Sequence, residues 1–76
     1  MILVETLELL SKARQYVEQG EQCMLHQREI VDLLELRGGD PLDAMLFLET
    51  LEDMQDAYVA HRDNLERKVM ALVRPE

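Results

Sequence analysis

A break at the midpoint of the chain divides its 76 residues into two halves of similar length. In Arg37-Gly38-Gly39-Asp40-Pro41, either glycine can take the left-handed conformation that ends a helix, and Arg37 complements the negative end of the helix dipole. Asp40 suits an N-cap, and Pro41 suits the first position of a new helix. The sequence therefore predicts a helix over about 4–37, a turn over 38–40 and a helix over about 41–73, which Pro75 would end.

Hydrophobic residues recur every seven positions in both halves. The first half has three such rows, the last of them small or mixed: Leu3, Leu10, Val17, Met24 and Val31; Ile2, Leu9, Tyr16, Cys23 and Ile30; and Thr6, Ala13, Gly20, Gln27 and Leu34. The second half has the row Ala44, Leu51, Tyr58, Leu65 and Leu72, flanked by Phe47, Met54, His61 and Lys68 and by Leu48, Gln55, Arg62 and Val69. A sustained seven-residue repeat is typical of a left-handed seam between helices. Because the connection is short, the helices must be antiparallel, and the prediction is a single all-α domain over 1–76, a coiled-coil-like helical hairpin.

The residues predicted to form the contact between the helices are Leu9, Leu10, Tyr16, Val17, Met24, Ile30, Val31, Leu48, Leu51, Tyr58, Leu65 and Val69. Folding at the turn places Leu34 opposite Ala44 or Met45, Val31 opposite Leu48 and Met24 opposite Met54 or Gln55. It also places Ala13 opposite Leu65 and Leu10 opposite Val69. Gly20 then falls opposite Tyr58, where the missing side chain would make room for the ring; the alternative is a tolerated surface glycine.

The apolar surface is wider than one partner helix can cover. Near the turn it spreads further, over Leu33, Leu36, Leu42, Met45 and Leu46. A chain this small needs a staple or an oligomer, and its one cysteine cannot form an internal disulfide. We therefore expect self-association, as a homodimeric four-helix bundle or a tetramer. A helix of a partner protein could also dock beside the apolar residues near the turn.

The amino-acid composition limits the kinds of partner that the protein can bind. The net charge of −8 argues against binding to phosphate backbones and to anionic membrane surfaces. No apolar run approaches the ~18 residues of a membrane span. The first residues carry no basic region ahead of a long apolar run, which predicts no signal peptide, and together with the lone cysteine this indicates a cytoplasmic protein.

Tyr16, Tyr58, His61 and Arg62 form a polar set within the predicted contact. This set could be a small binding pocket or a pH-sensitive contact, because histidine titrates near neutrality. The favoured interpretation is a polar layer that fixes register and orientation, as in coiled coils. No nucleophile or second base completes a catalytic group, so we expect a protein that is not an enzyme and holds no cofactor.

Two further groups resemble metal ligands by spacing. Cys23 and His26 could form a zinc site across a two-fold axis, but a buried cysteine and a surface histidine are favoured. Glu49, Glu52, Asp53 and Asp56 lie on one side of the second helix and are expected to be a solvated acidic face.

Several segments are similar to a family of short alpha-proteobacterial hairpin proteins of unknown function. These segments are Gln27-Arg28-Glu29-Ile30-Val31, the turn Gly38 to Asp40, Leu48-Glu49-Thr50-Leu51-Glu52 and His61-Arg62-Asp63-Asn64-Leu65, within residues 18 to 67. The resemblance implies a helical hairpin and draws attention to His61-Arg62-Asp63. The chain departs from the family at Pro41, where threonine is frequent, and in its leucine-rich first turns.

The function predicted from the sequence is a non-enzymatic, self-associating protein–protein interaction module. One alternative is a small ligand- or metal-binding bundle that uses Tyr16, Tyr58, His61 and Arg62. A second is a regulator associated with nucleic-acid complexes, which would have to bind DNA in a salt-dependent way despite the net charge of −8.

Overall fold

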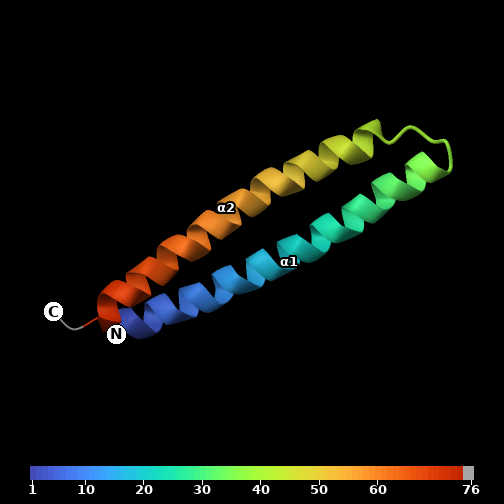
Figure 1. Cartoon of the computed structure of the whole chain (residues 1–76). Coiled ribbons are helices and arrows are strands. Elements are labelled where there is room, and N and C mark those ends of the chain that lie inside the picture. Colours follow the sequence, from blue (N-terminus) through green and yellow to red (C-terminus); the bar gives the residue numbers. More distant parts are fainter. Residues whose placement is uncertain (75–76) are drawn as a thin grey trace.

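The computed structural model describes residues 1–74, which form two antiparallel helices joined at one end (Figure 1). Helix α1 spans Ile2–Leu36 and helix α2 spans Leu42–Val73, in a rod of 60 × 14 × 14 Å. The predicted all-α hairpin is confirmed, although α1 begins two residues earlier than expected and ends one residue earlier. Pro75, predicted to end the second helix, lies outside the described residues. Within the described residues, neither helix has a stretch apolar and long enough to cross a membrane.

The end of α1 is closed by two glycine N–H groups. Gly38 takes a φ of 73°, its N–H donates to the Glu35 carbonyl over 3.2 Å, and the Gly39 N–H donates to the Leu34 carbonyl over 2.8 Å. This pair of bonds is the Schellman arrangement, which satisfies carbonyls that a helix end leaves free. The predicted left-handed glycine is therefore Gly38.

The start of α2 differs from the prediction by one residue, because its N-cap is Pro41 instead of Asp40 and carries no side-chain cap. The Asp40 Oδ1 accepts a hydrogen bond from the Leu42 N–H over 3.0 Å, which is an Asx turn that leads into the helix. Pro41 precedes the first helical residue instead of being it, and its carbonyl accepts from the Met45 N–H over 2.9 Å. The connection consequently spans residues 37–41 instead of 38–40.

Replacing Gly38 by alanine should lower the free energy of unfolding by about 1–2 kcal/mol, because a Cβ is strained at positive φ. Gly39→Ala is the matched control: Gly39 has no positive φ, and its added Cβ would make only a 3.4 Å contact with the side chain and carbonyl of Leu34. Urea unfolding at one fixed protein concentration would measure both. Equal losses for the two variants would contradict the assignment of the left-handed position to Gly38.

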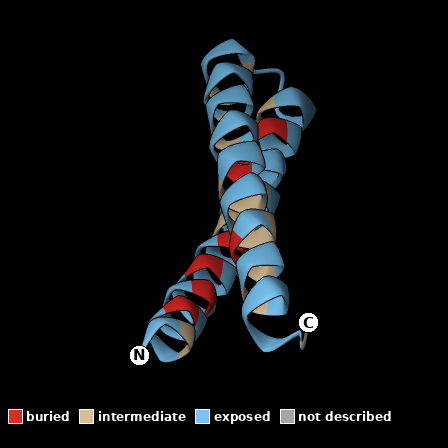
Figure 2. Cartoon of the chain, turned by 90° about the vertical axis from the view of Figure 1, so that its left-hand side faces the viewer, coloured by how far each residue is buried: buried red, intermediate tan, exposed pale blue. Residues whose placement is uncertain are grey.

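The contact between the helices, here called the seam, is a single line of residues on each helix. In α1 the seam consists of Leu3, Thr6, Leu10, Ala13, Val17, Gly20, Met24, Gln27, Val31 and Leu34, all buried or half-buried. In α2 it consists of Ala44, Leu48, Leu51, Gln55, Tyr58, Arg62, Leu65 and Val69, again all buried or half-buried. Both sets alternate spacings of three and four, as a coiled-coil seam does. Figure 2 shows the buried segments spread along the length of the two rods and exposed surface over most of the rest.

The composition of the α1 seam corrects the sequence analysis. The small or mixed row, from Thr6 to Leu34, faces α2, whereas most of the apolar row from Ile2 to Ile30 faces outward. Leu9, predicted to lie in the contact, is 52% exposed, and Cys23, predicted to be buried, is exposed. Tyr16 is also 52% exposed, but its ring stacks on Tyr58 of α2, so its predicted contact is present at the edge of the seam. Small residues let two helix backbones approach closely, so the helices contact each other through this row, where side chains are shortest.

The predicted register between the helices is correct in one cluster near the chain termini and wrong near the turn. Leu10, Ala13, Leu65 and Val69 pack in one cluster, as predicted. Near the turn, however, the Ala44 carbonyl accepts a hydrogen bond from Gln27 instead of facing Leu34, whose side chain lies against Gly39.

The connection between the helices is also longer than predicted. Five residues can span up to about 16 Å, so the chain can return partway along α1 before α2 begins. Figure 1 shows the first turn of α2 set back from the last turn of α1.

Candidate interaction surface

The two sides of the seam differ in chemistry. Successive residues of an α-helix are 100° apart, so Arg14 and Tyr16 project to opposite sides of a line through Ala13 and Val17. The structure agrees, because Arg14 and Tyr16 contact α2 on different sides: Arg14 bridges to Glu66, and Tyr16 stacks on Tyr58. The hairpin thus has two long faces that must be described separately.

One long face, here called the apolar face, carries the row that the seam leaves out. It consists of Ile2, Leu9, Tyr16, Cys23 and Ile30 from α1, with Phe47, Met54, His61 and Lys68 from α2. Most of its apolar members are half exposed or more, including Ile2 at 68% and Phe47 at 53%. Large apolar side chains in contact with water over a continuous stripe are typical of an interaction surface.

A hollow lies near the middle of the apolar face. It has a volume of about 140 Å³ and is lined by Tyr16, Gln19, Gly20, Cys23, Leu51, Met54 and Tyr58. Both helices contribute to it, which places the Tyr16 and Met54 rows on the same side of the hairpin. The Tyr16 and Tyr58 rings form one of its walls, stacked with centroids 5.7 Å apart and planes 17° apart.

The opposite long face, here called the charged face, carries ionic side chains across the seam. Its charged members are Arg14, Glu21, Arg28 and Glu35 from α1 and Glu52 and Glu66 from α2. The Arg14 guanidinium lies 3.5 Å from the Glu66 carboxylate, a solvent-exposed pair that contributes little stability. The same rows also hold Leu7, Met45, Val59 and Val73, so this face is mixed in character and carries all of the carboxylates that border the seam on either face.

The residues predicted to spread off the contact near the turn are exposed. Leu36 is 83% exposed, and the remaining members, Leu33, Leu42, Met45 and Leu46, are between 45% and 56% exposed. The set-back start of α2 leaves the last turn of α1 without a facing helix. This end of the hairpin therefore extends the exposed apolar surface.

Two buried glutamines, which the sequence analysis did not single out, form the polar layer of the seam. The Gln55 Nε2 donates to the Val17 carbonyl over 2.8 Å, and the Gln27 Nε2 donates to the Ala44 carbonyl over 2.9 Å. Each glutamine is less than a tenth exposed. Because a one-turn slip would break both bonds and leave buried polar groups unpaired, the pair holds the helices in register. The available signal was their position: each occupies a seven-residue row whose other members are mostly small or apolar.

Gly20 faces Gln55, so the prediction that it faces Tyr58 is wrong. A Cβ built on Gly20 would clash with the Oε1 and Cδ atoms of Gln55. One Cα hydrogen of Gly20 points in that direction and so meets Oε1, which has no other hydrogen-bond partner. Weak Cα–H···O contacts of this kind recur where helices approach closely. The absent side chain makes room for a carboxamide, not for an aromatic ring.

The predicted four-residue polar cluster is only half assembled. Tyr16 and Tyr58 stack, but His61 is exposed. The Arg62 guanidinium donates to Asp63 over 3.0 Å and lies 3.9 Å from Glu66, both on its own helix. Its charge is therefore matched locally, so Arg62 does not complete a binding pocket with the tyrosines.

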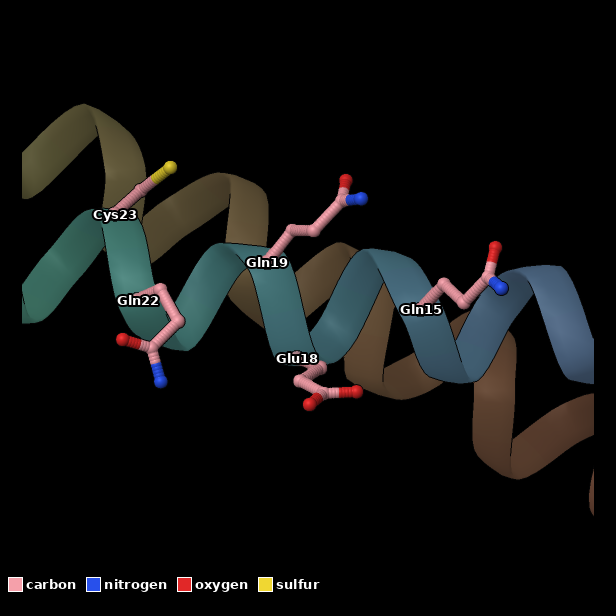
Figure 3. A pocket seen from close by; sticks show the side chains of 5 residues that line it. All are labelled: Gln15, Glu18, Gln19, Gln22 and Cys23. Atoms are coloured by element: carbon pink, nitrogen blue, oxygen red, sulfur yellow. The ribbon is translucent and has the colours of Figure 1, made fainter.

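The remaining candidate ligands lie apart on the surface. Within residues 1–74, no three histidine, cysteine or acidic side chains come close enough to hold a metal ion together. Cys23 and His26 are both exposed, as are Glu49, Glu52, Asp53 and Asp56. The larger hollow, of about 670 Å³, is lined by Gln15, Glu18, Gln19, Gln22 and Cys23. All five come from α1, and Figure 3 shows Gln22 and Glu18 pointing to one side of the helix and the other three to the opposite side.

Comparisons with family models, with curated proteins and with solved structures found no match to this chain.

Proposed function

We propose that the protein is a non-enzymatic interaction module that works by self-association of the hairpin. The observation that carries this proposal is the surface area. A compact monomer of 8.9 kDa exposes on the order of 4,800 Å², by the usual scaling of surface with mass. The hairpin exposes 6012 Å², an excess of roughly 1,200 Å² over that scaling estimate.

The core of a single hairpin is correspondingly thin. Within residues 1–74 the buried hydrophobic side chains are Leu10, Ala13, Val17, Val31 and Leu65. A standard protein–protein interface buries about 800 Å² on each partner, which is less than the excess area. Association through an interface of that size would remove about two thirds of the excess area, and a pair of hairpins would form a four-helix bundle.

The other predicted functions have weaker support. The ligand-binding alternative depends on a cluster of which Tyr16 and Tyr58 line the hollow while His61 and Arg62 do not, and the nucleic-acid alternative depends on a partner that a net charge of −8 repels. The proposal includes a cytoplasmic location, which the free thiol of Cys23 supports. It also includes membership of the alpha-proteobacterial hairpin family, which the helical hairpin supports.

Sedimentation equilibrium across a wide range of protein concentrations tests the proposal. We expect the mass to rise toward at least twice 8.9 kDa as concentration increases, with circular dichroism confirming helix throughout. A folded species that keeps the monomer mass at the highest attainable concentration would overturn the proposal.

A further inference from the structure

We propose that a second copy of this chain packs on the apolar face of the hairpin, with the charged face left in water. This inference rests on the proposed function and adds which of the two long faces associates. The rows that define the apolar face, from Ile2 to Ile30 and from Phe47 to Lys68, were given above. Three properties of these rows indicate a second copy as their occupant.

The first property is charge. The chain has 16 acidic residues and a net charge of −8, so two copies repel each other over most of their surface. No acidic residue occupies either row of the apolar face, whereas Glu21, Glu35, Glu52 and Glu66 all lie on the charged face. The apolar face is therefore the long side on which a copy can pack without bringing carboxylates together. Because these rows hold no carboxylate and a single lysine, Lys68, the face brings little like charge together when it packs on itself, as an interface between identical subunits related by a two-fold axis must.

The second property is length. The α1 row runs over 28 residue steps, from Ile2 to Ile30, which at 1.5 Å each is about 42 Å. A short docking helix from another protein would cover only part of this stripe. A second hairpin brings two helices of 35 and 32 residues, which can cover the whole stripe.

The third property is shape. The hollow bounded by Tyr16, Gly20, Met54 and Tyr58 is about 140 Å³, several times the ~30 Å³ that a water molecule occupies in the liquid. Mostly apolar side chains and two aromatic rings line it, so an apolar side chain fits it better than water does. A hole between helices that receives a side chain from a neighbouring helix is the packing unit of helical bundles.

The test compares two leucine variants that differ only in the face they alter. Leu9 on the apolar face and Leu25 outside it lie on the same helix and are 52% and 51% exposed. We expect Leu9→Glu to raise the dissociation constant of the dimer at least about tenfold, because it places a desolvated carboxylate in the interface. Leu25→Glu should leave the dissociation constant within about twofold of the parent protein. Sedimentation equilibrium measures both, with circular dichroism as the check on folding.

The native thiol gives a second readout that needs no variant. Cys23 lies on the apolar face and is exposed in the single hairpin, so packing of a copy should cover it. We expect the rate of iodoacetamide alkylation of Cys23 to fall in proportion to the dimer fraction as protein concentration rises. Suppose that the protein associates, but Cys23 still reacts at the monomer rate and the Leu9→Glu variant dimerises normally. This result would overturn the assignment of the interface to the apolar face and would leave the proposal of self-association intact. A protein that never associates would overturn both proposals.

Discussion

Truncation of Leu10 to alanine is expected to lower the free energy of unfolding by about 2–4 kcal/mol, the range for a large buried aliphatic side chain. Leu10 is 3% exposed and packs against Ala13 and Leu65, with Val69 at the edge of the cluster. In a seam only two seven-residue rows wide on each helix, few neighbouring side chains can move in to fill the cavity. The loss is a large share of the stability of a domain of this size, so the variant should be partly unfolded near physiological temperature.

Leu25→Ala serves as the control, because it removes the same atoms from a leucine that is 51% exposed. We expect it to cost less than about 1 kcal/mol, because little apolar area returns to water. Urea denaturation followed by circular dichroism, at one protein concentration for all variants, measures both changes. Similar losses for Leu10→Ala and Leu25→Ala would mean that the seam does not run through Leu10.

The second large effect on the free energy of unfolding is expected from substitution of Gly20, which contacts Gln55. A Cβ at position 20 would displace the Gln55 carboxamide and break its bond to the Val17 carbonyl. Leaving a buried amide without a partner costs about 1–3 kcal/mol, while alanine gains about 1 kcal/mol over glycine in a helix. Gly20→Ala should therefore lower the free energy of unfolding by up to about 2 kcal/mol. Gly20→Leu should also lower it, by about 1–3 kcal/mol of overpacking against Gln55.

A double-mutant cycle separates this cause from a general intolerance of side chains at the position. In a Gln55→Ala background the clash is gone, so Gly20→Ala should raise the free energy of unfolding by about 1 kcal/mol through helix propensity alone. The reversal of sign is the expected result, and the same unfolding experiment measures it. If Gly20→Ala had the same effect in both backgrounds, Gln55 would not be the group that position 20 accommodates.

Much of the hairpin could be predicted because its signals are local. A glycine that takes positive φ, an aspartate that precedes the next helix and the seven-residue repeat each act through a few neighbouring residues. Gly38 and the paired helices are found as expected, and Asp40 bonds the Leu42 N–H from one position before the N-cap. The cluster of Leu10, Ala13, Leu65 and Val69 was also foreseen.

The choice of face in the rest of α1 could not be predicted in this way. Hydrophobicity alone favours the row of Ile2, Leu9, Tyr16, Cys23 and Ile30 over the mixed row that contains Thr6 and Gln27. The structure selects the mixed row because glycine, alanine and threonine permit close approach, and because Gln27 and Gln55 find backbone carbonyls on the opposite helix. Such hydrogen bonds become visible only when the two helices are placed side by side.

The amino-acid sequence by itself determined that this protein forms two long helices with a break between them, since helix propensity, capping and periodicity are properties of short stretches of chain. Tertiary structure decided which row of each helix meets the other and how far α2 is set back along α1. These features depend on backbone separation and on hydrogen bonds between residues distant in sequence, such as Gln55 and Val17. The same packing leaves one neutral, apolar side of the rod open to water, and the proposed pairing of hairpins depends on that side.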